Sequence, residues 1–134
     1  MKILIIDQYG SNMESLFDLI NKNFHFTLVG CNSESEGVDY IKRAIKNENK
    51  IDVLFIDEKE ENLLSSPALV LANLYKKTVN PKMSIVFFTM LQKSPLIQDA
   101  IDVGYFNYYL SKTISKEDLM LFISNIRFIK HPFD

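Results

Sequence analysis

Four short apolar stretches of the chain end at side chains that can carry charge or donate a hydroxyl proton. In chain order these end residues are Asp7 with Gln8, Asp57, Thr89, and Ser111 with Lys112. A carboxylate can attack a phosphoryl group and hold it as an acyl phosphate. The added negative charge must then be met by cations and hydrogen-bond donors. If the fold brings these residues together, they have the composition of a site that captures phosphoryl groups.

A hard divalent ion would suit the same set of side chains. Carboxylates are its usual ligands, and such an ion would supply much of the positive charge beside a phosphoryl group. Lys112 would add a point charge and the Thr89 hydroxyl a donor. The alternative is structural, since Asp often ends strands at turns and Lys112 can simply neutralise Asp57.

The composition limits the other classes of function. The chain has 134 residues, which predicts one domain over 1–134, with 129–134 as a short tail. A net charge of −2 with scattered lysines excludes a nucleic-acid surface, and the lone Cys31 excludes a disulfide framework. The longest apolar stretch, Ile85–Leu91, is too short to span a bilayer. A charge after six residues argues against a signal peptide, so we expect a cytoplasmic protein without membrane contact.

Apolar runs alternate with helical patterns along the whole chain. The expected strands are Ile3–Ile6, Phe26–Cys31, Val53–Ile56, Ile85–Phe88 and Phe106–Leu110. Most are apolar at successive positions, which is typical of strands covered on both faces of a parallel sheet. The expected helix starts are Ser11, Ser33, Ser66-Pro67, Ser94-Pro95 and Ser115, and Gly104 is placed to end the fourth helix.

This order predicts an α/β fold with five βα units. The sheet should be parallel, open and doubly wound, of the flavodoxin-like kind with strand order 2-1-3-4-5. In such sheets the ligand site lies outside the carboxyl ends of the strands. The side chains named first should therefore converge there.

With these elements in place, the chain resembles the receiver domain of two-component response regulators over nearly its whole length. The matching segments are Ile3–Asp7, Asp52–Asp57, Ile85–Thr89 and Tyr109–Lys112. The resemblance implies that Asp57 accepts a phosphoryl group from a histidine kinase or a phosphotransfer protein.

The resemblance also assigns roles to the surrounding residues. Asp7, Asp57 and the backbone carbonyl of Lys59 would bind magnesium, with position 8 completing the acidic pocket. Thr89 and Lys112 would contact the phosphoryl group. Tyr109 would be the aromatic that switches with Thr89 and alters the face formed by the fourth helix, fifth strand and fifth helix, where a downstream protein would bind.

Departures from the family fall mainly in this site. Gln8 stands where a second acid is usual, and a unit charge pair at about 4 Å is worth roughly 4 kcal/mol at an effective dielectric near 20. We therefore expect magnesium binding to be weak or absent. The acidic run from Asp57 to Glu61 is typical of a solvated loop, although a glutamate pointing inward would compensate for Gln8. Met90 and Thr113 replace a small residue and a proline.

Three functional hypotheses follow. The first is an atypical, stand-alone, non-enzymatic response regulator that is phosphorylated on Asp57 and signals through altered protein contacts, with self-association into a homodimer left open. The second is a receiver-like module in which Lys112 pairs with Asp57 permanently and partner binding ignores phosphate. The third is a flavodoxin-like cofactor binder, suggested by the segment 8–12.

Overall fold

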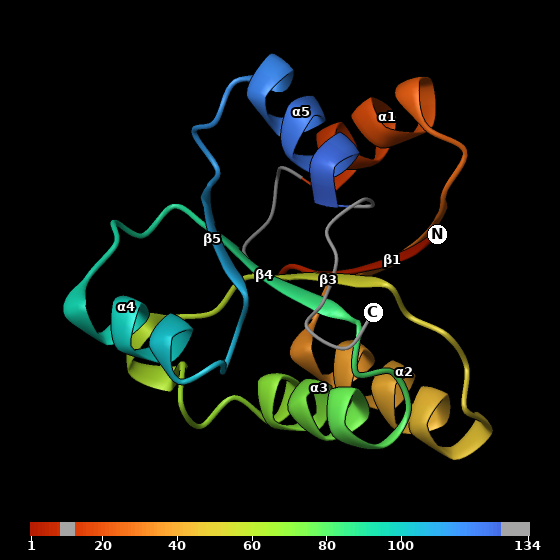
Figure 1. Ribbon diagram of the computed structural model, residues 1–134, viewed down its shortest axis with the longest axis vertical. Helices are drawn as coiled ribbons and strands as arrows, with labels where there is room; N and C mark the ends of the chain where they lie inside the picture. The colour runs from red at the N-terminus through yellow and green to blue at the C-terminus, as the bar shows by residue number, and fades with distance from the viewer. Residues whose placement is uncertain (9–12, 127–134) are drawn as a thin grey trace.

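The computed structural model describes residues 1–8 and 13–126, and within them strands and helices alternate along the chain (Figure 1). The strands are β1 (Lys2–Ile6), β2 (Thr27–Cys31), β3 (Val53–Ile56), β4 (Ser84–Thr89) and β5 (Tyr108–Ser111). The helices are α1 (Met13–Asn23), α2 (Glu34–Asn47), α3 (Pro67–Thr78), α4 (Pro95–Asp102) and α5 (Lys116–Ile126). A short 3-10 helix, η1 (Glu60–Asn62), follows β3. No helix among the described residues is long and apolar enough to cross a membrane.

All five strands are parallel and form one sheet in the order β2-β1-β3-β4-β5, which confirms the predicted α/β fold. The register aligns the carboxyl ends of the central strands. Ile6 at the end of β1 lies opposite Cys31 and Ile56, and Ile56 lies opposite Phe87 of β4. The residues that follow β1 and β3 therefore emerge side by side.

The helices cover the two faces of the sheet, as Figure 1 shows. On one face, α1 and α5 lie beside each other over alternate strand residues such as Ile5, Phe55 and Val86. On the other face, α2, α3 and α4 cover the intervening residues, including Leu54 and Ile85. This double coverage explains why the strands are apolar at successive positions.

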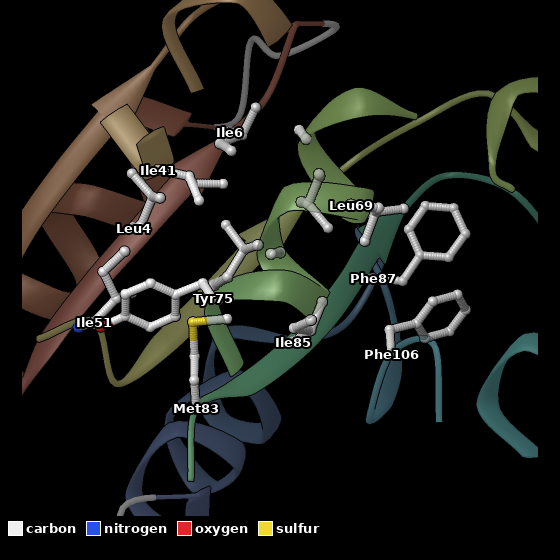
Figure 2. Close-up of a cluster of buried hydrophobic side chains, with 14 of the residues drawn as sticks. Leu4, Ile6, Ile41, Ile51, Leu69, Tyr75, Met83, Ile85, Phe87 and Phe106 are labelled. Carbon is white, nitrogen blue, oxygen red and sulfur yellow. Dashed lines mark hydrogen bonds between the residues drawn. The ribbon is translucent and has the colours of Figure 1, made fainter. Parts of the chain in front are cut away.

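Tyr75 anchors the core beneath α3, where Figure 2 shows it among aliphatic side chains. Its side chain is fully buried, and its hydroxyl accepts a hydrogen bond from the Ile51 backbone N–H at 2.6 Å. The same hydroxyl donates to the Asn49 carbonyl at 2.5 Å. A buried hydroxyl is tolerated here because both of these hydrogen bonds are made.

The helix starts agree with the serine positions in the sequence. The side chains of Ser33, Ser66 and Ser94 each accept a backbone N–H at the start of α2, α3 and α4, and Ser115 does so for α5. Gly104 has φ +79° two residues after α4 and donates its N–H to the Ile101 carbonyl. The predicted start at Ser11 and the tail 129–134 lie outside the described residues.

The last strand begins later than predicted, at Tyr108 rather than Phe106. The reason is Asn107, whose side-chain oxygen accepts the Ile85 N–H while its own N–H donates to the Ile85 carbonyl. This arrangement leaves Phe106 free to turn into the core, where its ring packs 5.1 Å from that of Phe87 (Figure 2).

Candidate functional site

Backbone hydrogen bonds fix the residues at the carboxyl ends of the strands. The N–H of Asp7 donates to the Cys31 carbonyl at 3.0 Å, and that of Asp57 donates to the Ile6 carbonyl at 3.1 Å. Lys112 donates its N–H to the carbonyl of Thr89 at 2.9 Å. The backbone hydrogen bonding between neighbouring strands therefore continues for one residue past the strand ends, and it holds the predicted site residues in place.

Lys112 links the two aspartates. Its Nζ lies 2.7 Å from Asp57 Oδ2 and 2.8 Å from Asp7 Oδ2. The side chains of Lys112, Asp57 and Asp7 are only 3%, 7% and 5% exposed, respectively. Burial by itself would lower the pKa of Lys112, but the hydrogen bonds and charges of Asp57 and Asp7 outweigh it and raise that pKa above its usual value. The ammonium is thus held in its charged form between two carboxylates.

Thr89 and Tyr109 meet at the loop after β4. The Thr89 hydroxyl oxygen accepts the Leu91 N–H at 3.1 Å, and the Tyr109 hydroxyl donates to the Leu91 carbonyl at 2.5 Å. Thr89 is buried and Tyr109 is half-buried. Thr89 and Tyr109, to which the resemblance gives a switch role, therefore both bind the backbone of Leu91 between β4 and α4.

Glu58 is the glutamate of the acidic run that points inward, an alternative that the sequence left open. The expectation of a solvated acidic loop is wrong here, because Glu58 is 3% exposed. Its Oε1 accepts the Lys59 N–H at 2.9 Å and lies 3.4 Å from the side-chain nitrogen of Gln8. Burial, followed by the nearby charge of Glu34, raises the pKa of Glu58. A glutamate thus points inward, and Gln8 is turned toward it.

Glu60 ties the same loop to α4. Its Oε1 accepts the hydroxyl proton of Ser94 at 2.8 Å, while Ser94 Oγ also accepts the Ile97 N–H at the start of α4. Glu61 is exposed, as expected of a solvated loop. The segment after Asp57 is therefore anchored beside Gln8 and also at the first turn of α4.

Comparison with known proteins shows a clear structural likeness. A response regulator from Thermotoga maritima has a TM-score of 0.71 at 16% identity, over 96% of this chain and 98% of that one. A response regulator receiver domain from Clostridium thermocellum has a TM-score of 0.63 at 23% identity, over 93% and 92%. A putative pilus assembly protein from Burkholderia thailandensis has a TM-score of 0.70 at 14% identity, over 96% and 99%. The chain has the receiver-domain fold.

The sequence comparisons add nothing to this result, because no protein-family model and no curated protein matches the chain significantly. The likeness therefore concerns the receiver fold alone. Four of the predicted positions, Asp7, Asp57, Thr89 and Lys112, do lie at the ends of neighbouring strands in this fold.

The groups that the resemblance assigns to magnesium make other contacts in this structure. Asp7 and Asp57 already share the Lys112 ammonium, and the third position is Gln8. The Lys59 carbonyl, which the resemblance made a ligand, accepts the Asn62 N–H at 3.0 Å within η1. Among the described residues, no three His, Cys, Asp or Glu side chains are grouped so that they could hold a metal ion.

The other departures from the receiver pattern have mild consequences for the site. Met90 is 63% exposed, so its long side chain lies mostly in solvent. Ser111 and Thr113 share a hydrogen bond between their hydroxyls at 2.7 Å, on the strand end beside Lys112. The flavin-binding hypothesis rested on the segment 8–12, of which residues 9–12 lie outside the described residues.

Proposed function

We propose that the chain is a signal receiver module in which Asp57 accepts a phosphoryl group from the phosphohistidine of a histidine kinase or phosphotransfer protein. The observation that carries the proposal is the buried contact of Lys112 with both Asp57 and Asp7. It places a permanent positive charge against the carboxylate that would be modified. The receiver fold supports the same function.

The transfer would proceed by attack of an Asp57 carboxylate oxygen on phosphorus. The new O–P bond forms as the P–N bond to the donor imidazole breaks, and the electron pair stays on that nitrogen, which takes a proton from water. Lys112 would remain paired with Asp7 while it meets the new phosphoryl charge, and the Thr89 hydroxyl would donate to a phosphoryl oxygen. The product is an acyl phosphate on Asp57.

The output would pass through the loop at Leu91. If the Thr89 side chain rotated to donate its hydroxyl proton to the phosphoryl group, its oxygen would leave the Leu91 N–H, and Tyr109 holds the carbonyl of that residue. A change here would reach α4 and the surface formed by α4, β5 and α5, where a downstream protein would bind. The module would act in the cytoplasm by protein contact, as a monomer or homodimer, without enzymatic activity of its own.

Magnesium would bind weakly or not at all in this proposal, because Gln8 supplies no charge. The test is incubation of the full chain with a small phosphodonor such as acetyl phosphate, with and without magnesium, followed by intact-mass measurement. We expect an acid-labile gain of one phosphoryl group on Asp57 that depends only weakly on magnesium. Asp57→Asn leaves Lys112 paired with Asp7, so this control should fold and remain unlabelled. No labelling, where an ordinary receiver domain is labelled, contradicts the proposal.

A second candidate is a phosphorylation-independent interaction module with the same fold. Lys112 favours it, since one ammonium satisfies both aspartates without any phosphate. In that case the phosphodonor would leave the amide exchange of the α4–β5–α5 surface unchanged, and Asp57→Asn would not alter partner binding. A flavodoxin-like function makes a simpler prediction, namely a coloured protein with bound flavin after purification.

A further inference from the structure

A cavity lies between α1 and α5, on the face of the sheet away from α2, α3 and α4. Its volume is about 190 Å³. Leu16 and Leu19 of α1, Phe88 of β4 and Leu119 of α5 form its apolar walls. Figure 1 shows these two helices side by side above the sheet. For comparison, an apolar cavity of about 150 Å³ is large enough to hold benzene.

Two positive charges line this cavity, from Lys112 and Lys116. No acidic side chain of residues 1–8 or 13–126 contributes to the lining. The Lys112 ammonium is already bound to Asp7 and Asp57. Lys116 is exposed and has no ion pair among the described residues, so its charge is available to a ligand in the cavity.

We propose that this cavity binds a small amphipathic anion, with an apolar part of one or two rings and a carboxylate or similar acidic group. The apolar part would pack between the leucines and Phe88, where burial of apolar surface favours binding. The acidic group would lie toward Lys116 in solvent. This site is separate from the proposed phosphoacceptor and does not depend on its chemistry.

The cavity and the acid site share a wall. The Lys112 side chain borders the cavity while its ammonium is bound to the aspartates, and Phe88 directly precedes Thr89. A ligand in the cavity would therefore lie against the Lys112 side chain. We expect its binding to shift the NMR signals of Lys112 at the end of β5.

The test is titration of the full chain with 1-naphthoate, followed by NMR of methyl and backbone signals. We expect saturable one-site binding with a dissociation constant below about 1 mM, and shifts at Leu16, Leu19, Leu119 and Lys112. Lys116→Gln should weaken naphthoate binding up to about fivefold, the range of an exposed ion pair, without affecting the neutral analogue 1-naphthalenemethanol. Lys77→Gln on α3, across the sheet, is the matched control and should bind as the unmodified chain does.

Blocking the cavity gives the decisive comparison. Ser15 is exposed and lines the cavity, so Ser15→Phe should fill it without disturbing the core and should abolish binding. Leu19→Trp serves the same purpose if Ser15→Phe loses its native spectrum. Unsaturable shifts, equal binding of the neutral analogue, or binding that survives both blocking variants would overturn the proposal. The proposal would also be overturned if the chain self-associates in solution and Ser15→Phe abolishes that self-association. A second copy of the chain would then occupy the cavity.

Discussion

Lys112 and Asp57 form a buried ion pair, with 2.7 Å between Nζ and Oδ2, although 55 positions separate them in the chain. Asp7 completes the group from the other side of the lysine, at 2.8 Å. Among the described residues, one buried ammonium therefore pairs with two buried carboxylates. This imbalance determines how substitutions at the three positions should differ.

Replacement of Lys112 should lower the free energy of unfolding. Lys112→Met leaves two buried carboxylates without their cation, and loss of one partner from a buried pair costs about 3–5 kcal/mol. We expect a loss of this size in the free energy of unfolding from urea titration at pH 7. Lys77→Met on the exposed side of α3 should change it by less than about 0.5 kcal/mol. Equal stability of the two variants would contradict the assigned role of Lys112.

The same ion pair predicts behaviour at alkaline pH. The pKa of Lys112 is raised in the folded chain, so its contribution to stability is complete below the unfolded value near 10.5 and is lost as pH rises through the folded value. The difference in unfolding free energy between the unmodified chain and Lys112→Met should therefore stay constant from pH 7 to 10 and decrease above that range. Urea titrations at matched pH values measure it. A difference that decreases below pH 9 would refute this origin.

The sequence predicted the architecture of the site better than its contacts. Apolar runs followed by Asp7, Asp57 and Lys112 determine which residues stand at the strand ends, and parallel topology then brings them together. The sequence could not decide whether Glu58 points inward, because its environment includes Gln8 from the turn after β1, 50 residues earlier. An acidic run has the same sequence pattern whether it is solvated or anchored.

The start of β5 is a second feature that the sequence pattern alone could not predict. Phe106 continues the apolar run of that strand, and only the pairing of Asn107 with Ile85 places it in the core instead. Side chains that replace backbone hydrogen-bonding groups leave no periodic signal in the sequence.

Glu58 should reduce stability at neutral pH. Its burial raises its pKa above the ordinary 4.5, so its favourable contribution is complete below that value and is lost as pH rises through the folded pKa. Glu58→Gln retains an oxygen for the Lys59 N–H and removes the buried charge. We expect a higher urea midpoint than that of the unmodified chain at pH 7, with the gain vanishing near pH 4. Glu61→Gln in the same loop is exposed and should show no gain. A less stable Glu58→Gln at pH 7 would contradict this account.

The Tyr109 hydroxyl should stabilise the loop that precedes α4. Tyr109→Phe removes its hydrogen bond to the Leu91 carbonyl, which is worth about 0.5–1.5 kcal/mol. We expect a loss of this size in unfolding free energy, together with faster amide exchange in residues 90–94. Tyr108→Phe, on the same strand and with no described hydrogen bond from its hydroxyl, should leave exchange in that loop unchanged. Unaltered exchange in Tyr109→Phe would mean that Leu91 is held by Thr89 alone.

Tyr105 should behave in the opposite way from Tyr109. Its hydroxyl is buried without a hydrogen-bond partner among the described residues, and burial raises its pKa. An unsatisfied buried hydroxyl costs about 1–3 kcal/mol, so Tyr105→Phe should be neutral or should raise the unfolding free energy by about 1 kcal/mol. The Asn73 side chain binds the Tyr105 backbone carbonyl, which this substitution leaves intact. Urea titration of the two Tyr→Phe variants in parallel measures the contrast, because the same atom is deleted in each. A loss at Tyr105 equal to that at Tyr109 would show that its hydroxyl has a partner in solution.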